Sequence, residues 1–266
     1  MRRLKNKVAV VYGNGAIGGA VARAFAMEGA KIFLAGLTPV KLKAIADEVL
    51  IEGGVIETAE VDALDEQAVE KHMNEVIKKA GKVDISFNAI GVASKDVQHT
   101  LLIDLPVANF SYPIVTYTES HFITAKAAAR RMTKQGHGVI IMHTANLSQV
   151  NAPLGGGRGP AWAALEALCR GLSVECGEYG MRAVCLFSTA IPETPIIENA
   201  FTELYEAKAK ASGMSRAQFD AVAASSTHRK KLTTLQELTD AAVFVASDEH
   251  TVIKQFQNLR IRIVHS

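Results

Sequence analysis

The sequence predicts one α/β domain with a doubly wound parallel sheet. Short apolar segments alternate with amphipathic helical segments along the chain, and a glycine-rich turn follows the first apolar segment. Strand-helix-strand connections of this kind are right-handed, so helices are expected on both faces of the sheet. With 266 residues and 48% hydrophobic content, the chain can bury a full core, and residues 1–266 are interpreted as a single domain.

Six short runs have the apolar, β-branched composition of buried strands. They span residues 8–12, 31–35, 55–61, 83–88, 139–144 and 183–188. An amphipathic helix is expected around residues 20–28. After the second strand, Thr38 and Pro39 predict the N-cap and the first residue of a helix, and Asp65 predicts the N-cap of the helix that follows the third strand. A lysine- and alanine-rich excursion around residues 193–226 predicts further helix, either as a cover over a ligand or as a solvated insertion.

The composition argues against several classes of function. The formal net charge is +2, with both signs spread along the chain, so no basic surface for nucleic acid is expected. No stretch reaches the roughly 18 apolar residues of a membrane span, and no signal peptide is recognised. Three cysteines without metal-ligand spacing predict reduced thiols and a cytoplasmic protein, and the eight histidines contain no H-x-x-x-H pair. We therefore expect no metal, no nucleic acid and no membrane partner.

A glycine turn of the form G-x-G-x-x-G lies between the first strand and the first helix. Its residues are Gly13, Asn14, Gly15, Ala16, Ile17 and Gly18. In this context the missing side chains let the backbone turn tightly and approach a pyrophosphate, whose charge meets unpaired amides at the helix N-terminus. The turn therefore predicts a Rossmann-type dinucleotide site. The alternative, a strand-helix turn without a ligand, is less favoured.

The sequence lacks the usual charged contact to the adenosine ribose. A site of this type usually has a carboxylate about 20 residues beyond the glycines, but the segment FLAGLTP at residues 33–39 contains neither a carboxylate nor an arginine. Thr38, Lys41 and Lys43 remain as weaker contacts for a 2′-phosphate. NADP(H) is therefore slightly favoured over NAD(H), and both cofactors remain open.

Three segments resemble the short-chain dehydrogenase/reductase family: GNGAIGGAVARAFAMEGA at residues 13–30, VDALDE at 61–66 and KVDISFNAIG at 82–91. The resemblance runs from about Lys5 to Asp248 and implies the fold and a nicotinamide dinucleotide. It adds five residues to the expected cofactor contacts. Asp62 and Ala63 match the adenine-binding segment, and Asn88, Ala89 and Gly91 match the segment that braces the central strand.

The chain departs from the family pattern at several points. Tyr12 replaces a threonine, the glycine turn is one residue shorter, and Ala16 stands where the family has glycine. Ser188 and Thr189 replace a proline and a glycine after the sixth predicted strand. The tail at residues 253–266 lacks the family's glycine pair, so the final strand is expected to pair differently.

The resemblance also identifies four positions where the family carries its catalytic residues. The family uses a tyrosine as proton donor, a lysine one helical turn later that lowers the pKa of the tyrosine, a serine that steadies the substrate oxygen, and an asparagine that holds a water. Alignment through residues 180–182 places Arg158, Trp162, Ala145 and Tyr117, respectively, at these positions. All four are replaced, and the Y-x-x-x-K signature occurs nowhere in the chain.

Arg158 has two interpretations. An arginine keeps a pKa above about 12 and cannot act as the acid, but its guanidinium binds anions through paired hydrogen bonds. Pro160 suits the first turn of a helix, so the helix is expected to begin later than in relatives and to leave Arg158 in the glycine-rich loop at residues 153–160. In that loop Arg158 either recognises an anion or is a solvated residue.

Aromatic side chains near these positions have both a catalytic and a packing interpretation. Tyr112, Tyr117 and His121 share helical spacing and include an alternative proton donor, although helix packing is favoured. Trp162 is more simply interpreted as a packing residue between helices.

Two hydroxyls, those of Thr144 and Ser148, are candidates to replace the missing serine. Local hydrogen bonding within the strand explains Thr144 equally well. His143 lies in the apolar run GVIIMHTA and is expected to be a packed or singly bonded core histidine.

The sequence leaves three hypotheses for function. The first is an NAD(P)(H)-dependent oxidoreductase that acts on an unknown carbonyl or alcohol substrate with a non-standard active site. The second is a catalytically inactive dinucleotide-binding sensor or partner subunit in which Arg158 recognises an anion, and the third is a purely structural subunit. The family resemblance favours the first, and it implies a homodimer or homotetramer through the alanine-rich helices at residues 122–132 and 160–176.

Overall fold

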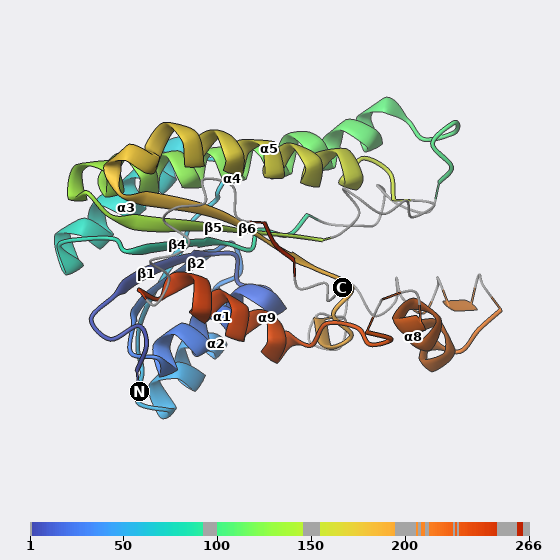
Figure 1. Ribbon diagram of the computed structural model, residues 1–266, viewed down its shortest axis with the longest axis horizontal. Helices are drawn as coiled ribbons and strands as arrows, with labels where there is room; N and C mark the ends of the chain where they lie inside the picture. The colour runs from blue at the N-terminus through green and yellow to red at the C-terminus, as the bar shows by residue number, and fades with distance from the viewer. Residues whose placement is uncertain are drawn as a thin grey trace.

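The computed structural model describes residues 2–92, 100–145, 155–194, 206, 209–210, 213–225, 227 and 229–248, together with the backbone of residues 260–262. One sheet lies between two layers of helices (Figure 1). All of its strands are parallel, in the order β3-β2-β1-β4-β5-β6-β7. The predicted doubly wound α/β fold is therefore confirmed.

The seven strands include the six that the sequence predicts, with ends shifted by a few residues. They are β1 (Val8–Tyr12), β2 (Lys31–Gly36), β3 (Val55–Glu60), β4 (Ile85–Asn88), β5 (Gly138–Ala145), β6 (Met181–Ser188) and β7 (Arg260–Arg262). The last strand pairs in parallel with β6. The rest of the glycine-free tail lies outside the described residues.

Helices cover both faces of the sheet (Figure 1). One layer contains α1 (Ala16–Met27), α2 (Pro39–Ile51) and α9 (Leu235–Ala246), and the other contains α3 (Glu66–Ala80), α4 (Val107–Gln135) and α5 (Arg158–Cys176). Within the predicted excursion at residues 193–226, the main described element is the helix α8 (Arg216–Ser225). Residues 195–205 of that excursion lie outside the described part.

The core consists of two apolar layers, one on each face of the sheet. On β1, Ala9 and Val11 face the α1 layer, whereas Val10 and Tyr12 face the α3 layer. Because both faces are covered, β1 is buried at every position and its sequence VAVVY is apolar throughout, as is typical of buried parallel strands. A shift of one residue in strand pairing would move every side chain to the opposite face, so the packing of both faces fixes the register of each strand. The register in turn determines which side chains lie at the carboxyl ends of the strands.

Helix α3 has the side-chain cap that the sequence predicts. The carboxylate of Asp65 accepts hydrogen bonds from the amides of Gln67 and Ala68, at 2.9 and 3.0 Å. Helix α2 begins at Pro39 with Thr38 as its N-cap, also as predicted, but the hydroxyl of Thr38 makes no capping hydrogen bond. The N-terminus of α3 is therefore stabilised by a side-chain cap, and that of α2 is not.

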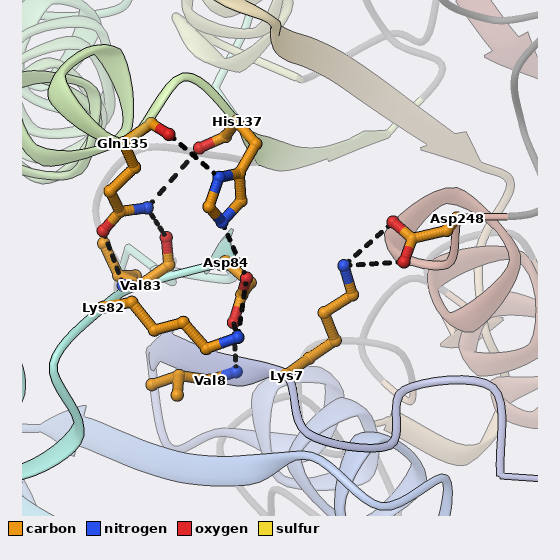
Figure 2. A network of polar contacts seen from close by, with 8 residues as sticks. All are labelled: Lys7, Val8, Lys82, Val83, Asp84, Gln135, His137 and Asp248. Atoms are coloured by element: carbon orange, nitrogen blue, oxygen red, sulfur yellow. Dashed lines mark hydrogen bonds and ion pairs between the residues drawn. The ribbon is translucent and has the colours of Figure 1, made fainter.

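A polar network fastens the strands at the edge where they begin (Figure 2). The buried carboxylate of Asp84 accepts a hydrogen bond from the amide of Val8, at 2.7 Å, and lies 3.1 Å from Nε2 of His137. The side-chain amide of Gln135 bonds both the amide and the carbonyl of Val83. These contacts join the starts of β1, β4 and β5, so the protein's own polar groups pair with one another at this end of the sheet. The opposite edge, where the strands end, carries the glycine turn.

Candidate dinucleotide and catalytic site

The glycine turn has a geometry that only glycine allows at two of its positions. Gly13 has a φ of +108°, and a Cβ atom there would lie 2.3 Å from the carbonyl oxygen of Ala89. A Cβ atom at Gly18 would lie 1.8 Å from the carbonyl oxygen of Gly13. Both distances are far inside van der Waals contact, so the turn is pressed against the end of β4 and against its own backbone.

This turn leads directly into the N-terminus of α1. The helix begins at Ala16, and its N-cap Gly15 has no side chain with which to cap the amides of the first turn. These amides and the helix dipole favour an anion at the carboxyl edge of the sheet. The residues present therefore fit the pyrophosphate of a dinucleotide, because Gly13 and Gly18 allow the tight turn and its close packing, and the N-cap Gly15 places no side chain over the helix N-terminus.

The predicted ribose contacts lie at the end of β2. Nδ2 of Asn14 donates a hydrogen bond to the carbonyl oxygen of Thr38, at 2.9 Å, which links the glycine turn to the start of α2. Lys43 forms an ion pair with Asp47 at 2.5 Å, so its ammonium is held one helical turn along α2. Lys41 is exposed on the first turn of the same helix.

The remaining predicted cofactor residues follow β3 and β4. Asp62 is exposed after β3, and one carboxylate oxygen accepts a hydrogen bond from the amide of Leu64 at 2.9 Å. Asn88 is fully buried at the end of β4, and its Nδ2 donates to the hydroxyl of Thr124 on α4, at 2.9 Å. The chain thus brings the predicted residues to the carboxyl ends of four adjacent strands, β3, β2, β1 and β4.

Three of the four aligned positions, Tyr117, Trp162 and Ala145, lie in or against a packed apolar cluster between α4 and α5. Tyr117 and Trp162 are 7% and 8% exposed, with ring centroids 6.2 Å apart. The buried cluster consists of Val92, Tyr117, Ala161, Trp162 and Leu165, with Ala145 packed against it. The predicted packing role of Trp162 therefore agrees with the structure, and large rings stand where the sequence alignment expects the family's asparagine and lysine.

The predicted environment of Arg158 is wrong in two respects. Arg158 is the first residue of α5 rather than a loop residue, and it is 6% exposed rather than solvated. Its Nη2 donates a hydrogen bond to the carbonyl oxygen of Val92, at 3.1 Å. Pro160 does not delay the helix, because the first-turn amides need no partner within the helix and a proline is tolerated there.

His121 is buried beside Tyr117, whereas Tyr112 is 48% exposed and lies outside the cluster. Nδ1 of His121 donates to the carbonyl oxygen of Tyr117, at 2.9 Å, and its buried Nε2 has no hydrogen-bond partner in the described part of the chain. Burial lowers the pKa of His121 to about 4. The imidazole is therefore neutral at pH 7 and is not a proton donor of useful acidity.

His143 and Ser188 form a contact that the sequence did not reveal. Nε2 of His143 lies 2.9 Å from the hydroxyl of Ser188, across the ends of β5 and β6. Burial, and to a smaller extent the neighbouring His121, lowers the pKa of His143 to about 4. The replacement of the family's proline by Ser188 was the available signal, because a hydroxyl at that strand end can reach the adjacent strand. His143 is thus the singly bonded histidine that the sequence predicts.

Tyr12, which replaces a threonine of the family, lies beneath the glycine turn. Its hydroxyl is 3.4 Å from Nδ1 of His72 on α3, and both side chains are buried. Burial raises the pKa of Tyr12 well above its ordinary value and lowers the pKa of His72 to about 4. Both groups are therefore neutral at pH 7 and support the turn by packing.

The hydroxyl of Thr144 is also buried and lies 3.5 Å from Sγ of Cys185 on the adjacent strand β6, so this contact joins two strands and is not the local bond within the strand that the sequence suggests. Ser148, the other predicted hydroxyl, lies outside the described residues. Among the residues that are described, no group of three His, Cys, Asp or Glu side chains is arranged to hold a metal ion. Within the same residues, no helix is both long enough and apolar enough to cross a membrane.

Comparison with known proteins places this geometry in a family. A family model described as Enoyl-(Acyl carrier protein) reductase matches residues 11–255. Secoisolariciresinol dehydrogenase of Forsythia intermedia is 30% identical over 196 residues, which cover 72% of this chain and 68% of that protein. Short chain aldehyde dehydrogenase 1 of Euphorbia lathyris is 26% identical over 250 residues, which cover 93% of this chain and 84% of that protein.

Solved structures agree at the level of the fold. The structure of NAD⁺-bound xylitol dehydrogenase superposes with a TM-score of 0.88 at 20% identity, covering 99% of this chain and all of that one. Levodione reductase superposes with a TM-score of 0.85 at 22% identity, covering 98% of this chain and 97% of that one. Since the family model covers most of the sequence and the fold and glycine turn agree with it, the chain belongs to the short-chain dehydrogenase/reductase family of oxidoreductases.

Proposed function

We propose that the chain is an NAD(P)(H)-dependent oxidoreductase that interconverts a carbonyl compound and an alcohol with a non-standard active site, and that it favours NADP(H). The observation that carries this proposal is the glycine turn. Gly13 and Gly18 leave no room for a Cβ atom, and the turn presents the N-terminus of α1 at the carboxyl edge of a parallel sheet. Relatives named as dehydrogenases and reductases support the carbonyl and alcohol substrate class.

The chain's residues have distinct tasks in this proposal. The amides of the glycine turn bind the pyrophosphate, Asp62 and Ala63 lie at the adenine, and the ends of β4 and β5 position the reactive ring. The bound dinucleotide supplies the hydride for reduction at the carbonyl carbon. Neither Arg158 nor Trp162 is an acid near neutral pH, so the proton for the alcohol oxygen comes from water. Positioning of the reactants then provides most of the rate enhancement.

A second candidate is a catalytically inactive dinucleotide-binding sensor or partner subunit. The packing of Tyr117 against Trp162 favours it, because the sequence aligns these residues with the family's water-binding asparagine and its lysine. Arg158, whose guanidinium is buried beside the carbonyl oxygen of Val92, is the group that would recognise an anion in this case. The two candidates share cofactor binding and differ only in turnover.

Two measurements test the proposal. Titration of NADPH and NADH, followed by cofactor fluorescence, should show saturable binding under both candidates. Saturation that is absent up to about millimolar cofactor would contradict both. Turnover across a panel of aldehydes, ketones and alcohols then separates the two candidates. If Arg158→Ala abolishes turnover and leaves dinucleotide affinity unchanged, Arg158 is part of the reaction rather than an optional anion contact.

We also propose a homodimer or homotetramer formed through α4 and α5. Apolar side chains are exposed on both helices, including Val115 and Phe122 on α4 and Val174 on α5. Association of these faces would remove that apolar surface from water. Sedimentation of the full chain as a monomer at micromolar concentration would contradict this assembly.

A further inference from the structure

Gly36 ends β2 directly beside the glycine turn. The amide of Gly13 donates to the carbonyl oxygen of Ala35, at 2.9 Å, and the amide of Val61 donates to the carbonyl oxygen of Gly36, at 3.2 Å. Position 36 is also about 20 residues beyond the glycines, where Rossmann-type sites place the acidic residue that binds the adenosine ribose. Gly36 therefore stands at the position where such sites usually carry the acidic residue.

The carboxamide of Asn14 occupies the space beside this glycine. A Cβ atom on Gly36 would lie 2.6 Å from both Cγ and Oδ1 of Asn14. The hydrogen bond from Nδ2 to the carbonyl oxygen of Thr38, at 2.9 Å, holds the carboxamide across the end of β2. Asn14 and a side chain at position 36 therefore exclude each other, and this chain has the former.

We propose that Asn14 takes the place of the acidic residue, contacts the 2′ position of the adenosine ribose, and thereby determines which dinucleotide the chain accepts. This inference rests on the proposed function, since it requires a dinucleotide at the glycine turn. Oδ1 accepts a hydrogen bond from a ribose hydroxyl, and the second N–H of the carboxamide donates to a phosphate oxygen. A neutral carboxamide does not repel a 2′-phosphate as a carboxylate would.

Two cations of α1 and α2 are paired with carboxylates. Arg23 on α1 pairs with Glu48, and Lys43 pairs with Asp47, each at 2.5 Å. These cations are thus engaged by carboxylates of α2. Lys41 is exposed on the first turn of α2 and adds a positive charge for a 2′-phosphate, whereas the carboxamide of Asn14 contacts the ribose.

The substitution Asn14→Asp tests the inference because it keeps the shape of the side chain and adds a negative charge. The dissociation constants of NADPH and NADH are measured on the full chain by cofactor fluorescence, with thermal melting to verify folding. The Kd for NADPH should rise about tenfold or more relative to that for NADH. Asn74→Asp is the matched control: it adds the same charge on α3, where Oδ1 of Asn74 accepts from Arg131 at 2.7 Å, and it should leave the ratio unchanged.

Gly36→Ala provides a second variant that adds no charge. Its Cβ atom would displace the Asn14 carboxamide, so the affinity for NADPH should fall while the chain stays folded. If Asn14→Asp leaves the ratio of the two dissociation constants within about twofold of the wild type, the inference is overturned and the proposed function stands. If the wild type binds neither dinucleotide, the proposed function fails and the inference fails with it.

Discussion

Two adjacent regions along the carboxyl edge of the sheet differ in how far they have departed from the family pattern. Around β1, α1 and the end of β4, the glycine turn retains a geometry that excludes side chains at Gly13 and Gly18. Around β5, α4 and α5, the residues that the sequence aligns with the family's catalytic positions, Tyr117, Arg158 and Trp162, are buried. The first region depends on backbone shape and the second on side-chain chemistry, so binding and catalysis can change independently in this fold.

The glycine turn and the catalytic side chains also differ in how easily the fold accommodates a substitution. A Cβ atom at Gly18 would meet a backbone carbonyl oxygen that cannot move without deforming the turn. In contrast, a catalytic tyrosine or lysine can be replaced wherever a side chain of suitable volume repacks the space. The rings of Tyr117 and Trp162 fill such a space in this chain.

The largest expected effect comes from restoring the family's catalytic residues. The quadruple variant Tyr117→Asn, Ala145→Ser, Arg158→Tyr and Trp162→Lys supplies an acid, a lysine to lower its pKa, a hydroxyl and a water ligand. General acid catalysis contributes about 10²–10⁴-fold, so turnover on the substrates of the panel should rise by a similar factor. Initial rates with NADPH and NADH provide the measurement.

The control for this variant has Arg158→Phe in place of Arg158→Tyr. Phenylalanine has the ring of tyrosine without the hydroxyl, so it tests the acid separately from the repacking. A folded, cofactor-binding quadruple variant that is no faster than the phenylalanine control would show that the assignment of Arg158 to the tyrosine position is wrong.

The next effect concerns the region that retains the family pattern. Gly18→Ala places a methyl group against the carbonyl oxygen of Gly13, so dinucleotide affinity should fall by about 100-fold. Gly171→Ala on α5 is the matched control, because its Cβ atom would meet nothing within 4 Å. That control should keep its affinity and gain about 0.5–1 kcal/mol of stability. Equal affinity in the two variants would contradict a ligand at the turn.

The sequence predicts the retained region far better than the replaced one. Alternating apolar segments and the glycine spacing depend on local periodicity and backbone conformation, and these are written in consecutive residues. The predicted strand at residues 8–12 matches β1, and Asp65 caps α3 as expected. Such features need no knowledge of distant partners.

The replaced region depends on contacts between residues distant in sequence. The sequence predicts Arg158 in a loop, but its guanidinium donates to the carbonyl oxygen of Val92, 66 positions earlier. The contact between His143 and Ser188, 45 positions apart, exists only because β5 and β6 are paired. The contact of Asn14 with the end of β2 likewise requires the folded turn. Sequence patterns identify these positions but not their neighbours.

A smaller expected effect is on the pH dependence of stability, which compares how well the two regions bury their histidines. Burial lowers the pKa of His72, near the turn, and of His121, in the replaced region, to about 4. In the unfolded chain a histidine has a pKa of about 6.5, so the unfolded state binds more protons between about pH 6.5 and 4. Stability should therefore be complete above the unfolded pKa and should fall as the pH decreases, by about 2 kcal/mol for each histidine at about pH 5.

Urea unfolding of His72→Gln and His121→Gln at neutral and mildly acidic pH measures this effect. In each variant, the loss of stability on acidification should be smaller by the contribution of the replaced histidine. His143 continues to titrate in both variants. Equal contributions would show that the two regions exclude water equally well. If His121→Gln keeps the full pH dependence of the wild type, His121 is hydrated in solution and the replaced region is loosely packed.

The smallest expected effect is on the free energy of unfolding, and it compares the N-terminal caps of α2 and α3. Both helices begin beside the proposed nucleotide site. Asp65→Ala removes a side chain that accepts from two amides of α3, so the free energy of unfolding should fall by about 1 kcal/mol. Thr38→Ala should cost only a few tenths of that, because the Thr38 hydroxyl caps nothing. Thermal or urea unfolding measures both variants. If Thr38→Ala costs as much as Asp65→Ala, the hydroxyl caps α2 in solution, and it is then occupied by the helix rather than left for the ligand.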